Sequence, residues 1–225
     1  MNNNNLYTKL HFIGFQVESP QDHKPDYSSD KFLSEYDLEM ILLQVCYEVD
    51  QDSRMLSLLF SWGQIHGEYI IANKFLKYYE VFIKTRGECP WVSAFCAFMV
   101  SLKRQKFTKG IKKFSEKVWV GGRPQEEGIK MKSAIDYLEP LNIFIPNGNI
   151  RIRNQDALSP EELLKVNRQY KSRYLFGANY RADIIYAVQM GFTNPYRISK
   201  TLQISYENVR DTYNDYIKLK ELQLL

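Results

Sequence analysis

The amino-acid sequence predicts a mainly α-helical protein with a small β-hairpin, in which a helical N-terminal domain precedes a smaller C-terminal domain of three helices. Three observations predict this fold class. The chain of 225 residues is 44% hydrophobic, which provides enough apolar surface for a packed core. It contains 16 Tyr and 13 Phe but only 11 Gly and 8 Pro, a balance that favours long packed elements over a loop-rich all-β chain. Apolar residues also recur at helical spacing through most of its length.

The N-terminal part is expected to begin with a flexible segment, residues 1–31, which starts with the polar run MNNNN and ends in a stretch rich in Ser, Pro and Asp. Inside this segment, the alternating residues 10–17 predict one short strand. A helical domain over residues 32–120 follows. The first predicted helix is capped by Ser34 or Asp30 and runs to about residue 49. The other predicted helices, separated by polar, Gly or Pro residues, cover 54–66, 69–84, 91–104 and 107–118.

Residues 121–158 are expected to form a helix, over 126–138, and then the β-hairpin. The hairpin is indicated by an Asn-Gly pair at 147–148 between two runs that alternate in polarity, because both turn residues tolerate positive φ. Arg151 and Arg153 would then point to the same side of the second strand. A helix followed by a hairpin with two arginines is also the order of a DNA-recognition helix and its wing, so this hairpin is a candidate wing.

Residues 159–225 are expected to form a helical linker and a compact domain of three helices. The linker helix begins with Ser159 as its N-cap, and Pro and two Glu follow in the first turn, where the helix dipole favours acidic side chains. Apolar residues at helical spacing then predict a helix over 181–190, a short helix capped by Asn194, and a third helix over 206–219.

The residues of this C-terminal part, RADIIYAV at 181–188 and NPYRISKTLQISYENVRDTY at 194–213, resemble the helix-turn-helix of bacterial winged-helix and related transcription regulators. Such regulators include those of toxin–antitoxin and phage-defence operons. The resemblance covers only residues 179–225, and Gln203 stands where the turn usually has Gly. It depends on Ser205 before the third helix and on four apolar residues, Ile198, Leu202, Ile204 and Val209.

This resemblance implies a C-terminal helix-turn-helix (winged-helix-like) domain whose third helix enters the major groove of DNA. There, Asn can pair bidentately with adenine and Arg with guanine. The same apolar pattern is also expected of three helices that serve only packing or dimerisation. The exposed positions expected to contact DNA are Ser205, Tyr206, Asn208, Arg210 and Asn214.

Charge is distributed unevenly along the chain. Residues 1–80 contain 6 Lys and Arg against 12 Asp and Glu, whereas residues 81–225 contain 24 against 14. An acidic N-terminal part suits a protein partner or a second copy of the chain, and a basic remainder suits an anionic partner. The strongest basic run, 103–117, holds 7 basic residues and 1 acidic residue. As a helix, this run would present four lysines either to DNA phosphates or only to solvent: Lys106, Lys109, Lys113 and Lys117.

Several classes of protein are not expected from this sequence. The longest apolar stretch, 93–102, is about half of the roughly 20 residues that cross a membrane, and MNNNN lacks the features of a secretion signal. The 3 Cys lie in apolar surroundings and are interpreted as reduced core residues, which predicts a cytoplasmic location. No pattern predicts catalytic, cofactor-binding or metal-binding residues, so we expect no enzyme, no cofactor and no metal.

These features together predict a DNA-binding transcriptional regulator of the kind that controls a toxin–antitoxin or phage-defence operon. Its partner would be double-stranded DNA, and its recognition helix would lie near residues 205–218. The alternative is a helical protein–protein adaptor in which the three-helix domain serves only packing or dimerisation. The two functions differ in whether the exposed side of the third helix contacts bases.

Overall fold

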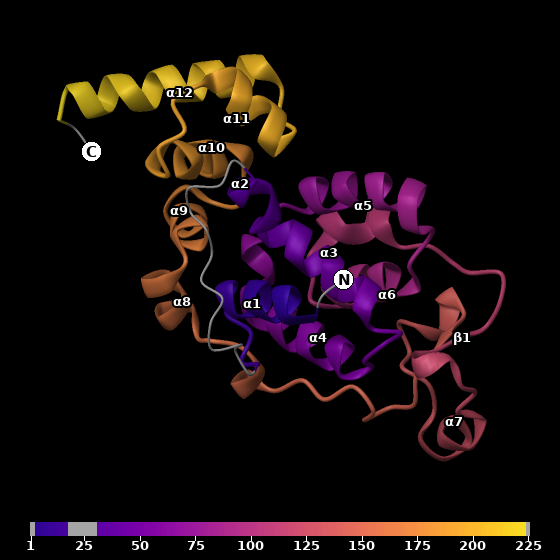
Figure 1. Ribbon diagram of the computed structural model, residues 1–225. Coiled ribbons are helices and arrows are strands. Elements are labelled where there is room, and N and C mark those ends of the chain that lie inside the picture. Colours follow the sequence, from indigo (N-terminus) through magenta and orange to yellow (C-terminus); the bar gives the residue numbers. More distant parts are fainter. Residues whose placement is uncertain (1–2, 18–30, 224–225) are drawn as a thin grey trace.

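The computed structural model describes residues 3–17 and 31–223, and over these ranges the chain is mostly helical. In Figure 1 the N-terminal and middle helices pack into one body, and the last three helices form a smaller layer above it. The α-helices are α1 (Asn3–Phe12), α2 (Phe32–Glu35), α3 (Leu38–Glu48), α4 (Arg54–His66), α5 (Ala72–Arg86), α6 (Pro90–Ser101), α7 (Glu126–Lys132), α8 (Pro160–Val166), α9 (Arg168–Phe176), α10 (Tyr180–Gln189), α11 (Pro195–Leu202) and α12 (Tyr206–Glu221).

Short elements connect these helices. The strands β1 (Val118–Trp119) and β2 (Ile143–Phe144) form a parallel pair, in which Val118 lies opposite Ile143. Turns of 3₁₀ helix occur at η1 (Gly67–Tyr69), η2 (Gln105–Gly110), η3 (Val120–Gly122), η4 (Glu139–Leu141) and η5 (Asn154–Asp156).

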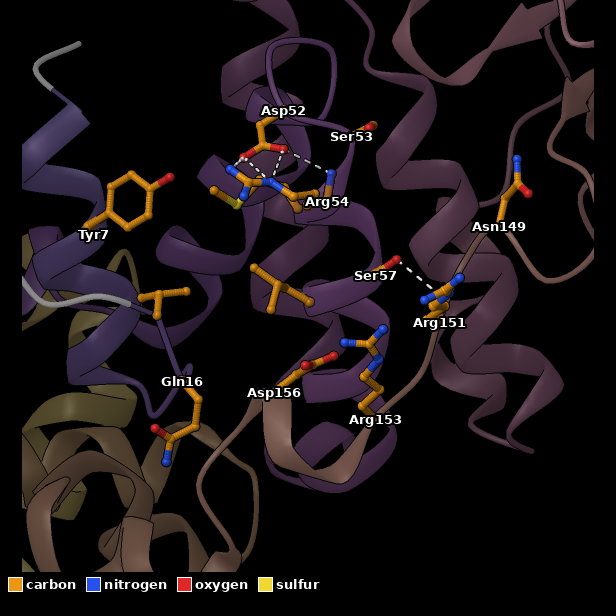
Figure 2. A pocket seen from close by; sticks show the side chains of 13 residues that line it. Tyr7, Gln16, Asp52, Ser53, Arg54, Ser57, Asn149, Arg151, Arg153 and Asp156 are labelled. Atoms are coloured by element: carbon orange, nitrogen blue, oxygen red, sulfur yellow. Dashed lines mark hydrogen bonds and ion pairs between the residues drawn. The ribbon is translucent and has the colours of Figure 1, made fainter.

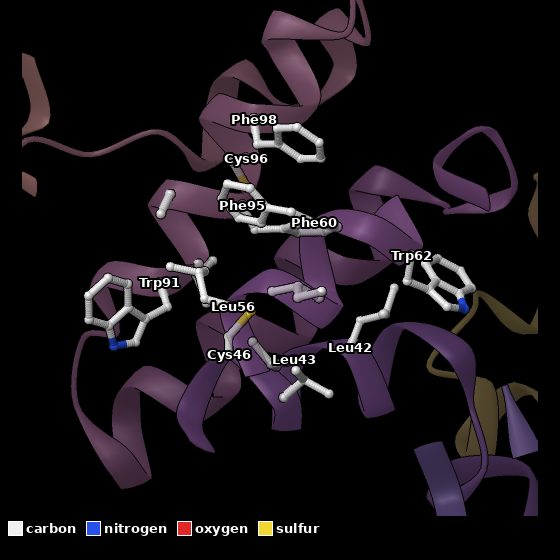
Figure 3. Close-up of a cluster of buried hydrophobic side chains, with 14 of the residues drawn as sticks. Leu42, Leu43, Cys46, Leu56, Phe60, Trp62, Trp91, Phe95, Cys96 and Phe98 are labelled. Atoms are coloured by element: carbon white, nitrogen blue, oxygen red, sulfur yellow. The ribbon is translucent and has the colours of Figure 1, made fainter. Parts of the chain in front are cut away.

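The main core lies between α3, α4 and α6, where apolar side chains from all three helices meet (Figure 3). Helix α6 is buried along most of its length because it consists almost entirely of apolar and small residues. The rings of Phe60 and Phe98 stack with their centroids 4.3 Å apart. Trp62 is fully buried, and its indole N–H donates to the carbonyl of Ile13 at 2.8 Å, which satisfies the polar atom of the ring.

The N-terminal residues differ from the expected flexible segment with a strand at 10–17. They form α1, and Leu6, Leu10 and Ile13 are buried in the main core. Their spacing of four and three residues places them on one face of a helix, and this periodicity outweighs the alternation that suggested a strand. Residues 18–30 of the expected segment lie outside the described residues.

The predicted hairpin at 142–153 is wrong, and with it the candidate wing. Strand β2 pairs in parallel with β1, while residues 151–153 run as extended chain beside α4. The Asn-Gly pair does form a turn, in which Gly148 has a φ of 81°. The second run is held away from the first because its backbone N–H groups donate to two serine hydroxyls of α4.

Most of the predicted helices are confirmed, although their ends shift. The helix predicted over 54–66 is α4, and Ser159 is the expected N-cap of α8, where it forms a capping box with Glu162. The helix predicted over 34–49 is broken between α2 and α3, because the Asp37 carboxylate accepts the N–H of Met40 and starts a new helix.

The helix predicted over 107–118 is wrong. Residues 105–110 form η2, and the chain then runs without regular structure to β1. Gly110 packs so closely on α6 that a Cβ atom there would lie 2.5 Å from the Sγ atom of Cys96. The chain therefore follows the surface of α6 instead of continuing as a helix. The helix predicted over 126–138 likewise ends early, at α7, where Ser133 has a φ of 57°.

Candidate nucleic-acid interface

Helices α10, α11 and α12 form a compact unit, called the C-terminal module below. The side chain of Asn179 caps α10, and that of Asn194 caps α11. Ser205 stands at the N-cap of α12, but its hydroxyl caps no N–H group among the described residues. The module has its own small core, which also includes two residues of α2. The buried residues of this core are Phe32, Leu33, Ile184, Tyr186, Ala187, Ile198, Leu202, Ile204 and Val209.

A tight turn at Gln203 joins α11 to α12. Gln203 adopts the left-handed conformation, with φ 54° and ψ 39°, and so performs the role that Gly usually has at this position. Ile204 is buried, and its carbonyl accepts the hydroxyl of Ser199 at 2.7 Å. The Nζ atom of Lys77 on α5 donates to the carbonyl of Gln203 at 2.5 Å and ties the turn to the body.

Replacing Gln203 with Gly is expected to stabilise the protein by about 1 kcal/mol, because a left-handed conformation costs a side-chain-bearing residue roughly that much. The contact from Lys77 uses the backbone carbonyl and is retained. Thermal unfolding of Gln203→Gly beside Gln203→Ala checks the prediction, since alanine keeps the strain. A Gly variant no more stable than the Ala variant would contradict it.

All residues of the third helix that were expected to contact DNA are exposed, whereas Val209 is fully buried. Successive residues of a helix are rotated by about 100°, so Asn208 and Arg210 lie on opposite flanks of α12, about 160° apart. An α-helix about 10–12 Å wide fills a major groove about 12 Å wide, so both flanks of an inserted helix face the groove. The exposed set is Ser205, Tyr206, Asn208, Arg210 and Asn214.

Acidic side chains lie between the two flanks of α12. Glu207 and Asp211 are exposed, and the Asp211 carboxylate accepts a hydrogen bond from the Nε atom of Arg210 at 3.0 Å. Both partners of this pair are largely solvated, so the pair is weak and leaves Arg210 able to exchange Asp211 for another acceptor.

Sequence reasoning missed the outer side of α11, which adjoins the start of α12. The rings of Tyr196 and Tyr206 have centroids 6.4 Å apart, and the Nζ atom of Lys200 lies 5.4 Å from the centroid of Tyr196. Arg197 is also exposed, with its guanidinium 5.4 Å from the ring centroid of Phe192. Residues 196, 197 and 200 follow helical spacing after the Asn194 cap, a signal that would have placed them together.

The other predicted DNA contacts are exposed but lie elsewhere on the molecule. Figure 1 shows α12 at the top left, the chain that leads to β1 at the far right, and α4 below the centre. Arg151 and Arg153 are beside α4, at a hollow described below. The four lysines predicted on one helix face lie instead on η2 and on the irregular chain before β1: Lys106, Lys109, Lys113 and Lys117.

A buried ionic network attaches the C-terminal module to the body. Arg173 of α9 donates to Asp183 of α10, at 2.8 Å from Nε and 2.9 Å from Nη2, and to Glu39 of α3, at 2.6 and 2.8 Å. Lys74 of α5 contacts Asp183 and Asp37, and all five side chains are at most 1% exposed. Since four helices contribute to this network, it fixes the direction in which α10 leaves the body.

Three carboxylates of the network share two cations, and the excess negative charge falls on Asp37. Burial, together with the carboxylates of Glu39 and Asp183, raises the pKa of Asp37 to about 6 against the attraction of Lys74. Burial also acts to raise the pKa of Asp183, but Arg173 and Lys74 outweigh it and hold that pKa below its usual value. Asp37 is therefore the group of the network that takes up a proton first as the pH falls.

A carboxyl group whose pKa is higher in the folded than in the unfolded protein binds a proton on folding, so its protonation favours the folded state. The stability that Asp37 contributes should thus increase as the pH falls from about 7.5 to about 5, from above the folded pKa towards the unfolded value near 4. We therefore expect the free energy of unfolding of the natural protein to rise relative to that of Asp37→Asn as the pH falls over this range. His66, whose pKa burial lowers to about 4, titrates in both proteins and cancels. Urea unfolding of both proteins at the two pH values measures this change. If the free energy of unfolding of the natural protein minus that of Asp37→Asn falls or stays constant between about pH 7.5 and about pH 5, the assignment is wrong.

The carboxylates of Asp37, Glu39 and Asp183 also have the spacing of a metal site, with ligand atoms within 4.8 Å of one another. Lys74 and Arg173 already lie among them and supply positive charge from the chain itself. The arrangement therefore needs no cation to hold the three carboxylates together.

No family model, curated protein or solved structure matches this chain. Among the described residues, no helix is long and apolar enough to cross a membrane.

Proposed function

We propose that the protein binds double-stranded DNA through its C-terminal module, with the first half of α12 in the major groove, and acts as a transcriptional regulator. The observation that carries this proposal is the left-handed turn at Gln203, which sets α12 against α11 while only Val209 of α12 is buried. A helix used for packing alone would bury more of its length. The exposed Asn208 and Arg210 are side chains that read bases, and the resemblance to regulators of toxin–antitoxin and phage-defence operons suggests a similar role.

Affinity for DNA is assigned to the outer side of α11. Arg197 and Lys200 are exposed beside the start of α12, where a helix-turn-helix contacts the phosphate backbone next to the groove. The rings of Tyr196 and Tyr206 hold the two helices together at this point and offer a hydroxyl to a phosphate. Asp183 belongs to the buried network, so its charge does not oppose DNA at this surface.

The charge-removing variant Arg197→Gln/Lys200→Gln is expected to bind duplex DNA more weakly, because two phosphate contacts are lost. The slope of the logarithm of its binding constant against the logarithm of the salt concentration (the salt slope) should be shallower by about 2. The matched control Lys109→Gln/Lys113→Gln removes the same charge from the chain between α6 and β1. Fluorescence anisotropy with mixed-sequence duplexes at about 50 and about 200 mM salt measures both.

The proposal requires that the control keep the natural salt slope. If the control loses as much affinity as the α11 variant, the interface lies on the lysine-rich chain and not on the module. If the natural protein binds no duplex, the adaptor function is favoured, because α12 ends in the exposed apolar side chains Leu219 and Leu222.

A further inference from the structure

A hollow of about 840 Å³ opens beside the start of α4, well away from the C-terminal module. Its volume lies within the range of about 300–1,000 Å³ that is typical of small-molecule sites. Figure 2 shows Tyr7 and Gln16 on one side of the hollow and Arg151 and Arg153 on the other. Asp52 and Arg54 lie across its upper end and pair with each other at 2.7 Å.

The backbone of the two arginines is positioned by helix α4. The backbone N–H of Arg151 donates to the hydroxyl of Ser57 at 3.2 Å, and that of Arg153 donates to the hydroxyl of Ser61 at 3.0 Å. Four residues of helix rise about 6 Å and two residues of extended chain about 6.6 Å, so alternate N–H groups match serines one turn apart. This match turns both side chains towards the same hollow.

The guanidinium groups of Arg151 and Arg153 are not engaged by other side chains that the structure describes. Over residues 3–17 and 31–223, neither guanidinium has a hydrogen bond or an ion pair to another residue. Asp156 also lines the hollow and keeps its charge while it accepts the hydroxyl of Ser61 at 2.7 Å, so with Asp52 the lining holds two carboxylates against three arginines. Two guanidinium groups that face one hollow form the geometry in which arginine binds phosphate, since each presents a planar fork of N–H donors.

We propose that this hollow binds a small phosphorylated molecule, with its phosphate between Arg151 and Arg153. The ring of Tyr7 on the opposite wall provides an apolar face for the rest of the ligand, and the amides of Gln16 and Asn149 provide donors and acceptors. A nucleotide has each of these parts, and inorganic phosphate has the first. This site is independent of the proposed DNA-binding function.

Isothermal titration of the full chain with ATP, AMP, adenosine and sodium phosphate tests the proposal. The variant Arg151→Gln/Arg153→Gln keeps both backbone N–H groups, so the contacts to Ser57 and Ser61 remain. It is expected to bind the phosphorylated probes at least about tenfold more weakly, because charged hydrogen bonds are lost. The matched control Lys113→Gln/Arg123→Gln removes equal charge outside the hollow and should bind as the natural protein does.

The probes distinguish the two sources of phosphate. Tighter binding of AMP or ATP than of sodium phosphate identifies a nucleotide, equal binding identifies phosphate itself, and either result supports the site when adenosine alone does not bind. The proposal is overturned if no phosphorylated probe binds at millimolar concentration, or if the arginine variant binds as tightly as the control. It is also overturned if the arginine variant loses duplex DNA binding while no small probe binds, since the arginines would then contact DNA.

Discussion

Replacing Arg173 with methionine is expected to lower the free energy of unfolding by about 3–5 kcal/mol, the usual cost of removing one partner from a buried ion pair. Arg173 is fully buried and donates from all its nitrogens, to Glu39, to Asp183 and, at 2.9 Å, to the carbonyl of Tyr69. Methionine fills much of the same space but brings no charge. The carboxylates that Arg173 neutralises would then share Lys74 alone.

Urea unfolding measures this loss, and Lys171→Met is the matched control. Lys171 lies on the same helix, is exposed, and should change the stability by no more than about 0.5 kcal/mol. Adding Glu39→Gln to Arg173→Met should recover part of the loss, because it removes one of the unpaired charges. If Arg173→Met costs no more than the control, the network does not hold the module to the body. If Arg173→Met does not fold, the milder Arg173→Lys carries the comparison.

The network could not be predicted from the sequence. A lysine or arginine among polar neighbours in a helix predicts a solvated face, because such residues are rarely buried. Lys74 and Arg173 are separated by almost a hundred residues, and only the packing of α3, α5, α9 and α10 brings them to the same carboxylates. Nothing in the local pattern around either residue indicates this convergence.

The helices were predicted best where local signals determine them. Helix α4 begins after Ser53 and ends at His66, directly before Gly67, as the polar break and the glycine indicated. The prediction of the hairpin was wrong because the groups that bind its second run are distant in the sequence. The backbone N–H of Arg151 donates to the hydroxyl of Ser57, 94 residues away. A turn signal predicts the turn itself, and the fate of the flanking strands depends on contacts that no short window contains.

The candidate interface was predicted only in part, because some of its features depend on local spacing and others on contacts between elements. The core of the C-terminal module is local, so the burial of Val209 and the exposure of its neighbours followed from helical spacing. The grouping of Arg197 with the start of α12 depends on the left-handed turn at Gln203, a conformation that glutamine rarely adopts and that helical spacing does not indicate.

Alanine at Asn208 or Arg210 is expected to change which DNA sequences the protein selects, while alanine at Val209 changes its stability. A bidentate contact from Asn or Arg discriminates between bases by about 1–3 kcal/mol, so each exposed variant should lose preference at one base step. The fold should barely respond, because both side chains are solvated and exposed substitutions change stability by about 0.5 kcal/mol or less. Val209 is 0% exposed, so its truncation should cost about 1–3 kcal/mol through lost burial and a small cavity.

Selection from randomised duplexes, run beside thermal unfolding of the same three variants, separates the two effects. Because Asn208 and Arg210 lie on opposite flanks of α12, their losses of preference should fall at different positions of the selected site. Asp211→Asn releases Arg210 from the carboxylate at 3.0 Å and should raise affinity for all duplexes, because one negative charge leaves the face that meets DNA. If Asn208→Ala and Arg210→Ala select the same sequences as the natural protein, α12 does not read bases. The module would then serve packing or protein binding, as the adaptor function requires.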